Sequence, residues 1–119
     1  MDLHEVMKKH TFVILGDTLN KEKYAYKIKA AMLEAGYQVY AVPKEFASIN
    51  DVPGEIEMID LCIHPVKGLK LLKECHKSCE GVVIQPGAEN EQLLNWLENQ
   101  NIPYLRSCLL KGLDLYGNK

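Results

Sequence analysis

The sequence predicts an α/β fold in three layers, with helices on both faces of a five-stranded parallel sheet. Continuous apolar runs rich in β-branched residues, such as residues 11–15, are typical of strands that are buried on both faces. These runs alternate with helical patterns, which favours parallel strands. Right-handed crossovers leave few topologies. The order 3-2-1-4-5 of a Rossmann-like sheet is favoured, and the flavodoxin-like order 2-1-3-4-5 is the alternative.

The elements follow from the periodicity of apolar residues. In the main amphipathic helix, Ala25, Ile28 and Met32 are spaced by three and four residues, with Asn20 as the candidate N-cap and Gly36 at the C-terminal end. Residues 43–57 contain two prolines and a glycine and are expected to form a loop with at most one helical turn. Strands are expected at 11–15, 37–42, 58–63, 81–84 and 103–109, and helices at 2–9, 21–35, from Pro65 to about Cys75, and 89–99, before a polar tail.

Composition limits the classes of function. A chain of 119 residues favours a single domain over 1–119, and its 47% hydrophobic and 25% charged residues are ordinary for a globular protein. The net charge of -2 provides no basic surface for nucleic acid. No apolar run approaches the roughly 20 residues of a membrane span, and the N-terminus does not resemble a signal peptide. A cytoplasmic location is therefore expected.

The four cysteines are expected to be free thiols, as is usual in a reducing compartment. Cys75, His76 and Cys79 lie close together in the sequence, which raises the question of a metal site. They lack a second ligand pair at a zinc-like spacing, and the end of a helix is the simpler interpretation. We therefore expect no metal site.

Two loops are candidates for holding a ligand. In open α/β sheets, ligands bind beyond the carboxyl ends of the strands, where the strand order reverses. The favoured order puts this point between the first and fourth strands, where residues 16–20 and 85–90 lead into helices. Helix N-termini favour anions, Gly16 permits a close backbone approach, and Thr18 offers a hydroxyl. Gly87 suits a turn, although a glycine or threonine in such a loop can also serve the turn alone.

The residues after the second strand bear on the choice of ligand. Proteins that bind NAD usually place an acid there, but this chain has Val42, Pro43 and Lys44, and Glu45 follows only afterwards. A lysine suits a phosphorylated ribose better than an unmodified one. The alternative interpretation of Lys44 is a solvated loop lysine.

Together these landmarks resemble the small stand-alone CoA-binding domain family, related to the CoA-binding domain of the succinyl-CoA synthetase α subunit. The resemblance covers about residues 11–110. It rests on "LGDTLNKEKYAYKI", "GYQVYAVP", "FASINDVPGEIEMIDLCI" and above all "GVVIQPGAENEQLLNWLENQNIPYLRSC". This chain departs from the family's pattern at Asp17 and Thr18, at His64, and in a shorter loop after the second strand.

The resemblance implies a nucleotide-binding domain that holds CoA or acyl-CoA through its ADP moiety, at the carboxyl ends of strands 1, 2 and 4. The implied contacts with the ligand fall in four groups: Gly16, Asp17, Thr18 and Tyr26; Val42, Pro43 and Lys44; His64 and Pro65; and Gln85, Pro86 and Gly87.

No convincing catalytic pair emerges from the sequence. His64 is the only histidine expected at the ligand edge, where it can also cap a strand or helix, and Cys108 is most simply a small buried residue. A CoA-binding module without catalysis is therefore favoured over an enzyme. The alternatives are a small acyl or phosphoryl transferase that acts with a partner, and a degenerate member that binds a protein and no nucleotide. A protein partner or a homodimer stays open.

Overall fold

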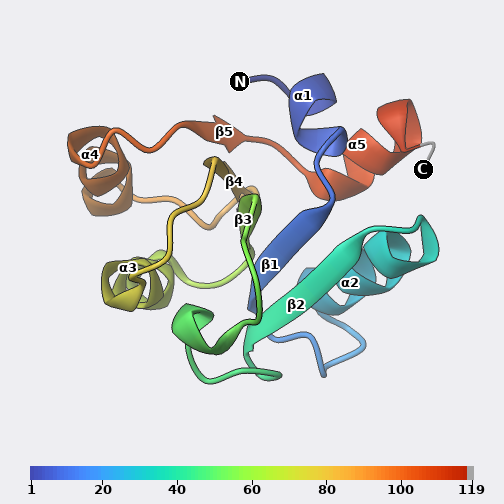
Figure 1. The fold of residues 1–119 in the computed structure, drawn as a ribbon, viewed down its shortest axis with the longest axis horizontal. Helices are drawn as coiled ribbons and strands as arrows, with labels where there is room; N and C mark the ends of the chain where they lie inside the picture. The colour runs from blue at the N-terminus through green and yellow to red at the C-terminus, as the bar shows by residue number, and fades with distance from the viewer. Residues whose placement is uncertain (118–119) are drawn as a thin grey trace.

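The structure is a computed structural model that describes residues 1–117, and it forms one parallel sheet flanked by helices (Figure 1). The α/β class, the Rossmann-like layering and the five-stranded parallel sheet are confirmed. The elements in chain order are α1 (Leu3–Met7), β1 (Thr11–Gly16), α2 (Tyr24–Glu34), β2 (Gln38–Pro43), the 3₁₀ helix η1 (Ile49–Asp51), β3 (Met58–Leu61), α3 (Pro65–Glu74), β4 (Gly81–Ile84), α4 (Glu91–Asn99), β5 (Tyr104–Arg106) and α5 (Leu109–Tyr116).

The strand order is β2-β1-β3-β4-β5. This is the alternative order 2-1-3-4-5, so the favoured order 3-2-1-4-5, with the third strand at an edge, is corrected. The physical reason lies in burial: every residue of β3 is buried, which suits a central strand. In β2, by contrast, Gln38 and Pro43 are exposed, which suits an edge strand. A polar residue and a proline at the two ends of β2 are compatible with an edge position.

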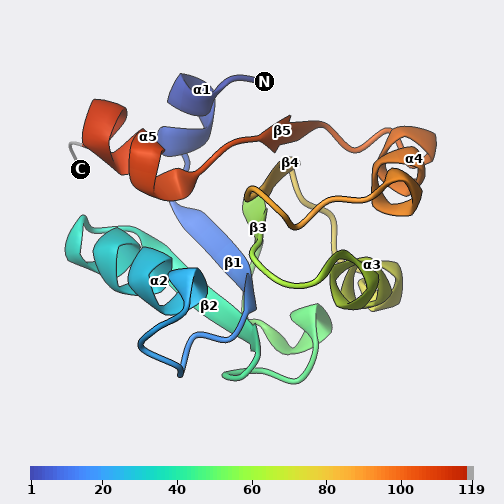
Figure 2. The same cartoon turned by 180° about the vertical axis from the view of Figure 1, so that it is seen from behind.

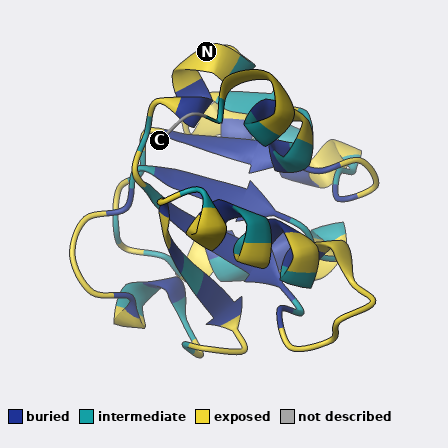
Figure 3. Ribbon diagram, turned by 90° about the vertical axis from the view of Figure 1, so that its right-hand side faces the viewer, coloured by how far each residue is buried: buried dark blue, intermediate teal, exposed yellow. Residues whose placement is uncertain are grey.

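Each face of the sheet has its own core. In β1, Phe12 and Ile14 pack toward α1, α2 and α5, whereas Val13 and Leu15 pack toward η1, α3 and α4. Seen from behind in Figure 2, α2 and α5 lie on one side of the sheet and α3 and α4 on the other. Figure 3 shows the buried strands between helices whose outer surfaces are exposed. This alternation along β1 is the usual pattern of a sheet covered on both faces.

The helix α2 begins at Tyr24, three residues later than expected. The candidate cap Asn20 is used in the preceding turn, where its side-chain oxygen accepts a hydrogen bond from the backbone N–H of Glu22 at 3.0 Å. The Asp17 carboxylate likewise accepts hydrogen bonds from the N–H groups of Leu19 and Asn20. These local bonds compete with helix formation and delay its start.

The helix α5 is absent from the sequence prediction, which extended the fifth strand to residue 109 and gave the tail no structure. Leu109 is fully buried in the core on the α2 face. Gly112 lies so close to α1 that a Cβ there would sit 2.6 Å from the sulfur of Met7. α5 is thus held by its packing against α1 and α2. None of the helices within residues 1–117 combines the length and apolar character that a membrane crossing requires.

Candidate functional site

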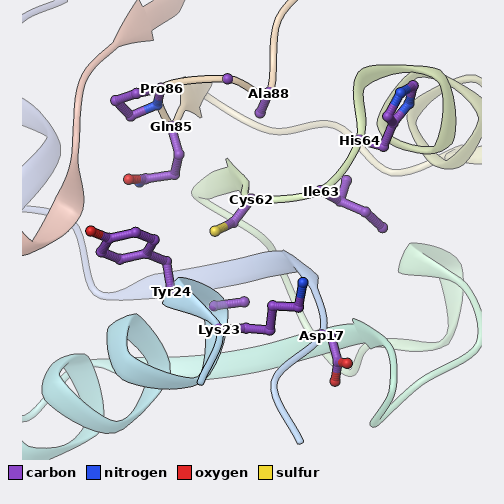
Figure 4. Close-up of a pocket in the computed structure, with 11 residues that line it drawn as sticks. Asp17, Lys23, Tyr24, Cys62, Ile63, His64, Gln85, Pro86 and Ala88 are labelled. Atoms are coloured by element: carbon purple, nitrogen blue, oxygen red, sulfur yellow. The ribbon is translucent and has the colours of Figure 1, made fainter. Parts of the chain in front are cut away.

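A cavity of about 350 Å³ opens at the carboxyl ends of β1, β3 and β4 (Figure 4). Because β1 pairs with β2 on one side and β3 on the other, the strand order reverses between β1 and β3. The sequence analysis placed this point between the first and fourth strands, which the observed order corrects. The cavity lies at the corrected position, where α/β sheets bind ligands. Its lining residues are Asp17, Lys23, Tyr24, Ala25, Cys62, Ile63, His64, Gln85, Pro86, Gly87 and Ala88.

The first turn of α2 forms one wall of the cavity through Lys23, Tyr24 and Ala25. Lys23 is the N-cap residue, and no side chain of the described residues accepts a hydrogen bond as a cap there. The first N–H groups of a helix carry partial positive charge and need acceptors. The Lys23 ammonium adds a full positive charge on the same wall. This wall is therefore suited to an anion such as a phosphate.

The glycine that ends β1 is required by packing. A Cβ on Gly16 would lie 2.6 Å from the carbonyl oxygen of Cys62 and 2.8 Å from the Cβ of Ala25. Gly16 therefore lets β3 and the start of α2 approach β1 closely, and it does not itself line the cavity. Its role in bringing these elements together is structural, whatever the cavity holds.

Thr18 follows in the same loop and is only 4% exposed. Its hydroxyl oxygen is buried and has no hydrogen-bond partner among the described residues. A buried hydroxyl without a partner is unusual, because its desolvation is left uncompensated. Thr18 is not among the residues that line the cavity.

The loop after β4 forms the opposite wall. Gly87 adopts φ 89°, a conformation that glycine accepts without strain, and the backbone N–H of Ala88 donates to the carbonyl of Gln85 at 3.0 Å. The following helix α4 is capped by Asn90, whose side-chain oxygen accepts from the N–H of Leu93. Residues 85–90 were expected to lead directly into a helix with free N–H groups. The Asn90 cap makes α2, and not α4, the helix that presents an uncapped end to the cavity.

Beneath this loop lies a buried carboxyl group. Asp60 of β3 is fully buried, and its Oδ1 accepts a hydrogen bond from Nε2 of Gln85 at 2.6 Å. Its second oxygen, Oδ2, has no partner among residues 1–117. Desolvation by burial raises the pKa of Asp60 to about 7, and the hydrogen bond from Gln85 offsets part of that rise. Sequence reasoning missed this pair, because "MIDLCI" fits a strand even with one acidic residue, and nothing in the stretch points to Gln85 as its partner.

His64 lines the cavity at the end of β3, but one of its nitrogens is already used. Its Nδ1 accepts a hydrogen bond from the backbone N–H of Val66 at 3.2 Å, which caps α3. Pro65 occupies the first helical position, where a missing N–H costs nothing. The capping role foreseen for His64 is confirmed.

A second, more enclosed cavity of about 210 Å³ adjoins the first. We call it the inner chamber. It shares Tyr24, Cys62, Gln85 and Pro86 with the first cavity and adds Cys108 from the N-cap position of α5. Burial is the main cause that raises the pKa of the Cys62 thiol to about 12, with smaller contributions from Asp60 and Cys108. Cys62 is thus neutral at physiological pH, and the inner chamber is largely apolar.

The structure brings together some of the predicted site residues and not others. Asp17, His64, Gln85, Pro86 and Gly87 line the cavity. The loop after β2 lies apart from it: Val42 is buried in the core, and Pro43 and Lys44 are exposed. Glu45 forms an ion pair with Lys29 at 2.9 Å. The predicted residues outside the cavity lining are Gly16, Thr18, Tyr26, Val42, Pro43, Lys44 and Pro65.

Sequence reasoning missed other residues of the cavity. Lys23, Tyr24 and Ala25 were missed because the helix was expected to start at residue 21, which put them inside its first turns. Cys62 and Ile63 were assigned to the end of the third strand, which in fact ends at Leu61. Within residues 1–117, no group of three or more histidine, cysteine or acidic side chains is placed to hold a metal ion.

Fold and cavity together define a Rossmann-like α/β domain with a candidate ligand site where its strand order reverses. A family model described as a CoA binding domain matches residues 10–114, and the chain belongs to this family. A search of curated proteins gave no match.

Solved structures agree with this fold. Prb, described as PH1109 protein redesigned for binding, superposes with a TM-score of 0.85 at 18% identity, over 99% of this chain and 92% of that one. A hypothetical protein from Pyrococcus horikoshii OT3 gives a TM-score of 0.85 at 19% identity, over 97% and 89%. A conserved hypothetical protein from Pyrococcus furiosus gives 0.75 at 22% identity, over 87% and 99%. At these identities the likeness shows the fold.

Proposed function

We propose that this protein is a nucleotide-binding module that holds CoA or an acyl-CoA through its ADP moiety, without chemistry of its own. The observation that carries the proposal is the cavity at the reversal of strand order, walled by the uncapped N-terminus of α2. Membership of the CoA-binding domain family supports the choice of ligand.

In this proposal the pyrophosphate lies against the start of α2. Backbone N–H groups and the Lys23 ammonium supply positive charge there, as helix N-termini do in other phosphate sites. Gly87 lets the opposite wall approach the ligand as backbone, without a side chain. Thr18 contributes its buried hydroxyl if the loop of residues 16–20 shifts on binding, and Asp17 and Tyr26 border the same region.

The adenosine would lie toward the end of β2, beside Val42, Pro43 and Lys44. The exposed Lys44 is free of any ion pair among the described residues and is available to a 3′-phosphate. His64 and Pro65 close the site at the end of β3, and Gln85, Pro86 and Gly87 close it after β4.

The absence of catalysis is supported by the state of two groups that line the cavity, His64 and Cys62. Nδ1 of His64 is occupied by the cap of α3, which leaves one nitrogen for the cavity. The Cys62 thiol has a pKa of about 12 and is a poor nucleophile, since the thiolate is the reactive form. Neither group is paired with an activating base among residues 1–117.

We expect CoA to bind more tightly than NAD. The end of β2 offers a lysine where NAD sites usually offer an acid for the ribose hydroxyls. Isothermal titration calorimetry of the purified chain with each ligand measures the difference. NAD binding tighter by about tenfold, or about 1.4 kcal/mol, would reverse the assignment. No binding of either ligand would favour the degenerate member that binds a protein.

Replacing Lys44 with alanine should weaken CoA several-fold and leave 3′-dephospho-CoA nearly unaffected. An exposed charge contact of this kind is worth about 1 kcal/mol, and it should weaken further as salt is added. The control is Lys111→Ala, which removes an exposed lysine from α5, outside the cavity lining. An equal loss of affinity for both ligands in Lys44→Ala would mean that Lys44 supports the loop and does not contact the 3′-phosphate. No loss of affinity for either ligand would mean that Lys44 is a solvated lysine.

A further inference from the structure

We propose that Asp60 is a positioning residue for the ligand site: it orients the side-chain amide of Gln85, so that Gln85 presents its oxygen to a hydrogen-bond donor on the arm of the ligand. This proposal rests on the proposed function. It also assigns the part of the ligand beyond the ADP moiety to the inner chamber.

The side chain of Gln85 is 5% exposed and lines both the first cavity and the inner chamber. Its Nε2 is committed to Oδ1 of Asp60 at 2.6 Å. Its Oε1 receives no hydrogen bond from the described residues, and Figure 4 shows the amide turned toward the side of the cavity where the Tyr24 ring lies. An amide oxygen placed in this way can accept a hydrogen bond from a ligand.

The Asp60 carboxyl sets the orientation of this amide. Its Oδ1 accepts the hydrogen bond from Nε2 of Gln85, so the NH₂ group of Gln85 points inward and its oxygen is left for the cavity. Asp60 sits in the centre of the sheet, with Ile14 opposite it on β1 and Val83 on β4. A buried acid at this position is costly, because it is desolvated and Oδ2 is left without a partner. The bond to Gln85 is the one polar contact that Asp60 makes within residues 1–117.

The arm of CoA beyond the diphosphate carries two amide N–H groups, a hydroxyl and a terminal thiol on an otherwise aliphatic chain. The inner chamber matches this mixture: it is largely apolar, with the Tyr24 ring, Pro86 and two cysteine side chains, and it offers the amide acceptor of Gln85. An amide N–H of the arm that donates to Gln85 would satisfy both partners.

The test compares CoA with adenosine 3′,5′-diphosphate, which lacks the arm and the second phosphate of the 5′-diphosphate. Asp60→Leu and Gln85→Leu should each lower CoA affinity about fivefold, the range of a neutral hydrogen bond, and leave affinity for adenosine 3′,5′-diphosphate unchanged. Because both residues serve one contact, the double variant should lose no more than either single variant. Asp60→Asn keeps an oxygen that can accept from Gln85, so it should retain near wild-type CoA affinity.

The outcomes separate the two proposals. Thermal melting first establishes that each variant is folded, and Asp60→Asn and Gln85→Leu still test the contact if Asp60→Leu does not fold. Equal losses for both ligands, additive losses in the double variant, or a CoA affinity that Gln85→Leu does not change would overturn the positioning role. Wild-type protein that binds adenosine 3′,5′-diphosphate and CoA equally would also overturn it while sparing the proposed function. Wild-type protein that binds neither would overturn both.

Discussion

Replacing Gly16 with alanine is expected to destabilise the fold by about 3 kcal/mol, at the upper end of the usual cost of overpacking. The new Cβ would lie 2.6 Å from the carbonyl oxygen of Cys62 and 2.8 Å from the Cβ of Ala25. The first neighbour is backbone of the chain leaving β3 and the second is part of α2. Neither can move aside as the end of a flexible side chain would.

Urea denaturation at neutral pH measures this loss as a lower midpoint with an unchanged slope. A matched control is Gly54→Ala, where a Cβ meets no atom within 4 Å. That variant should cost about 1–2 kcal/mol, because only the left-handed backbone at φ 73° opposes it. Equal losses in the two variants would contradict the close approach at Gly16. A larger residue such as valine at position 16 would destabilise the fold in the same way. Loss of ligand binding in Gly16→Val would therefore not demonstrate a phosphate contact.

Replacing Asp60 with asparagine should stabilise the protein above neutral pH, by up to about 4 kcal/mol. Burial raises the pKa of Asp60 from 3.8 to about 7, and each pH unit between the two values is worth about 1.36 kcal/mol. Between these values the native state holds a proton that the unfolded chain has released. The contribution of Asp60 to the free energy of unfolding therefore falls as pH rises from about 4 to 7, and its full penalty persists above pH 7.

The measurement is the difference in free energy of unfolding between wild type and Asp60→Asn from pH 4 to pH 8. Taking the difference cancels groups that titrate alike in both proteins, such as Glu57, whose pKa is lowered by hydrogen bonds from the N–H groups of His10 and Thr11 despite partial desolvation. The free energy of unfolding of Asp60→Asn should rise relative to that of the wild type up to about pH 7, and the difference should then stay constant. A difference that does not change with pH would mean that Asp60 is ionised throughout.

The class of fold could be predicted from the sequence because each strand is a short apolar run between helical patterns. The strand order could not be settled in the same way, since all central strands look alike. The pair of Asp60 and Gln85 shows a similar limit. The two residues are 25 positions apart, and the sequence alone does not indicate that they form a hydrogen bond. α5 escaped prediction because its stability comes from packing against α1 and α2.

The candidate site could be predicted in part. The loops after β1 and β4 were expected to meet, and Asp17, Gln85 and Gly87 do lie around one cavity. Lys23 and Tyr24 were missed because the local hydrogen bonds of Asp17 and Asn20 delay the start of α2. Whether such side-chain bonds or helical bonds form depends on the folded structure around them. The partners of the loop after β2 depend on a ligand, so the roles of Pro43 and Lys44 remain proposals.

The most direct test of the account is a map of where CoA binds. Amide resonances of ¹⁵N-labelled protein can be followed by NMR as CoA is added. The proposal predicts the largest shifts around the cavity, at Lys23–Ala25, Cys62–His64, Gln85, Gly87 and Ala88, and at Val42 and Lys44 beside the adenosine. A third cavity, at the other end of the sheet and lined by residues 54–57 and 77–80, serves as the internal comparison. Shifts confined to that end, or no shifts at saturating CoA, would contradict the proposed site.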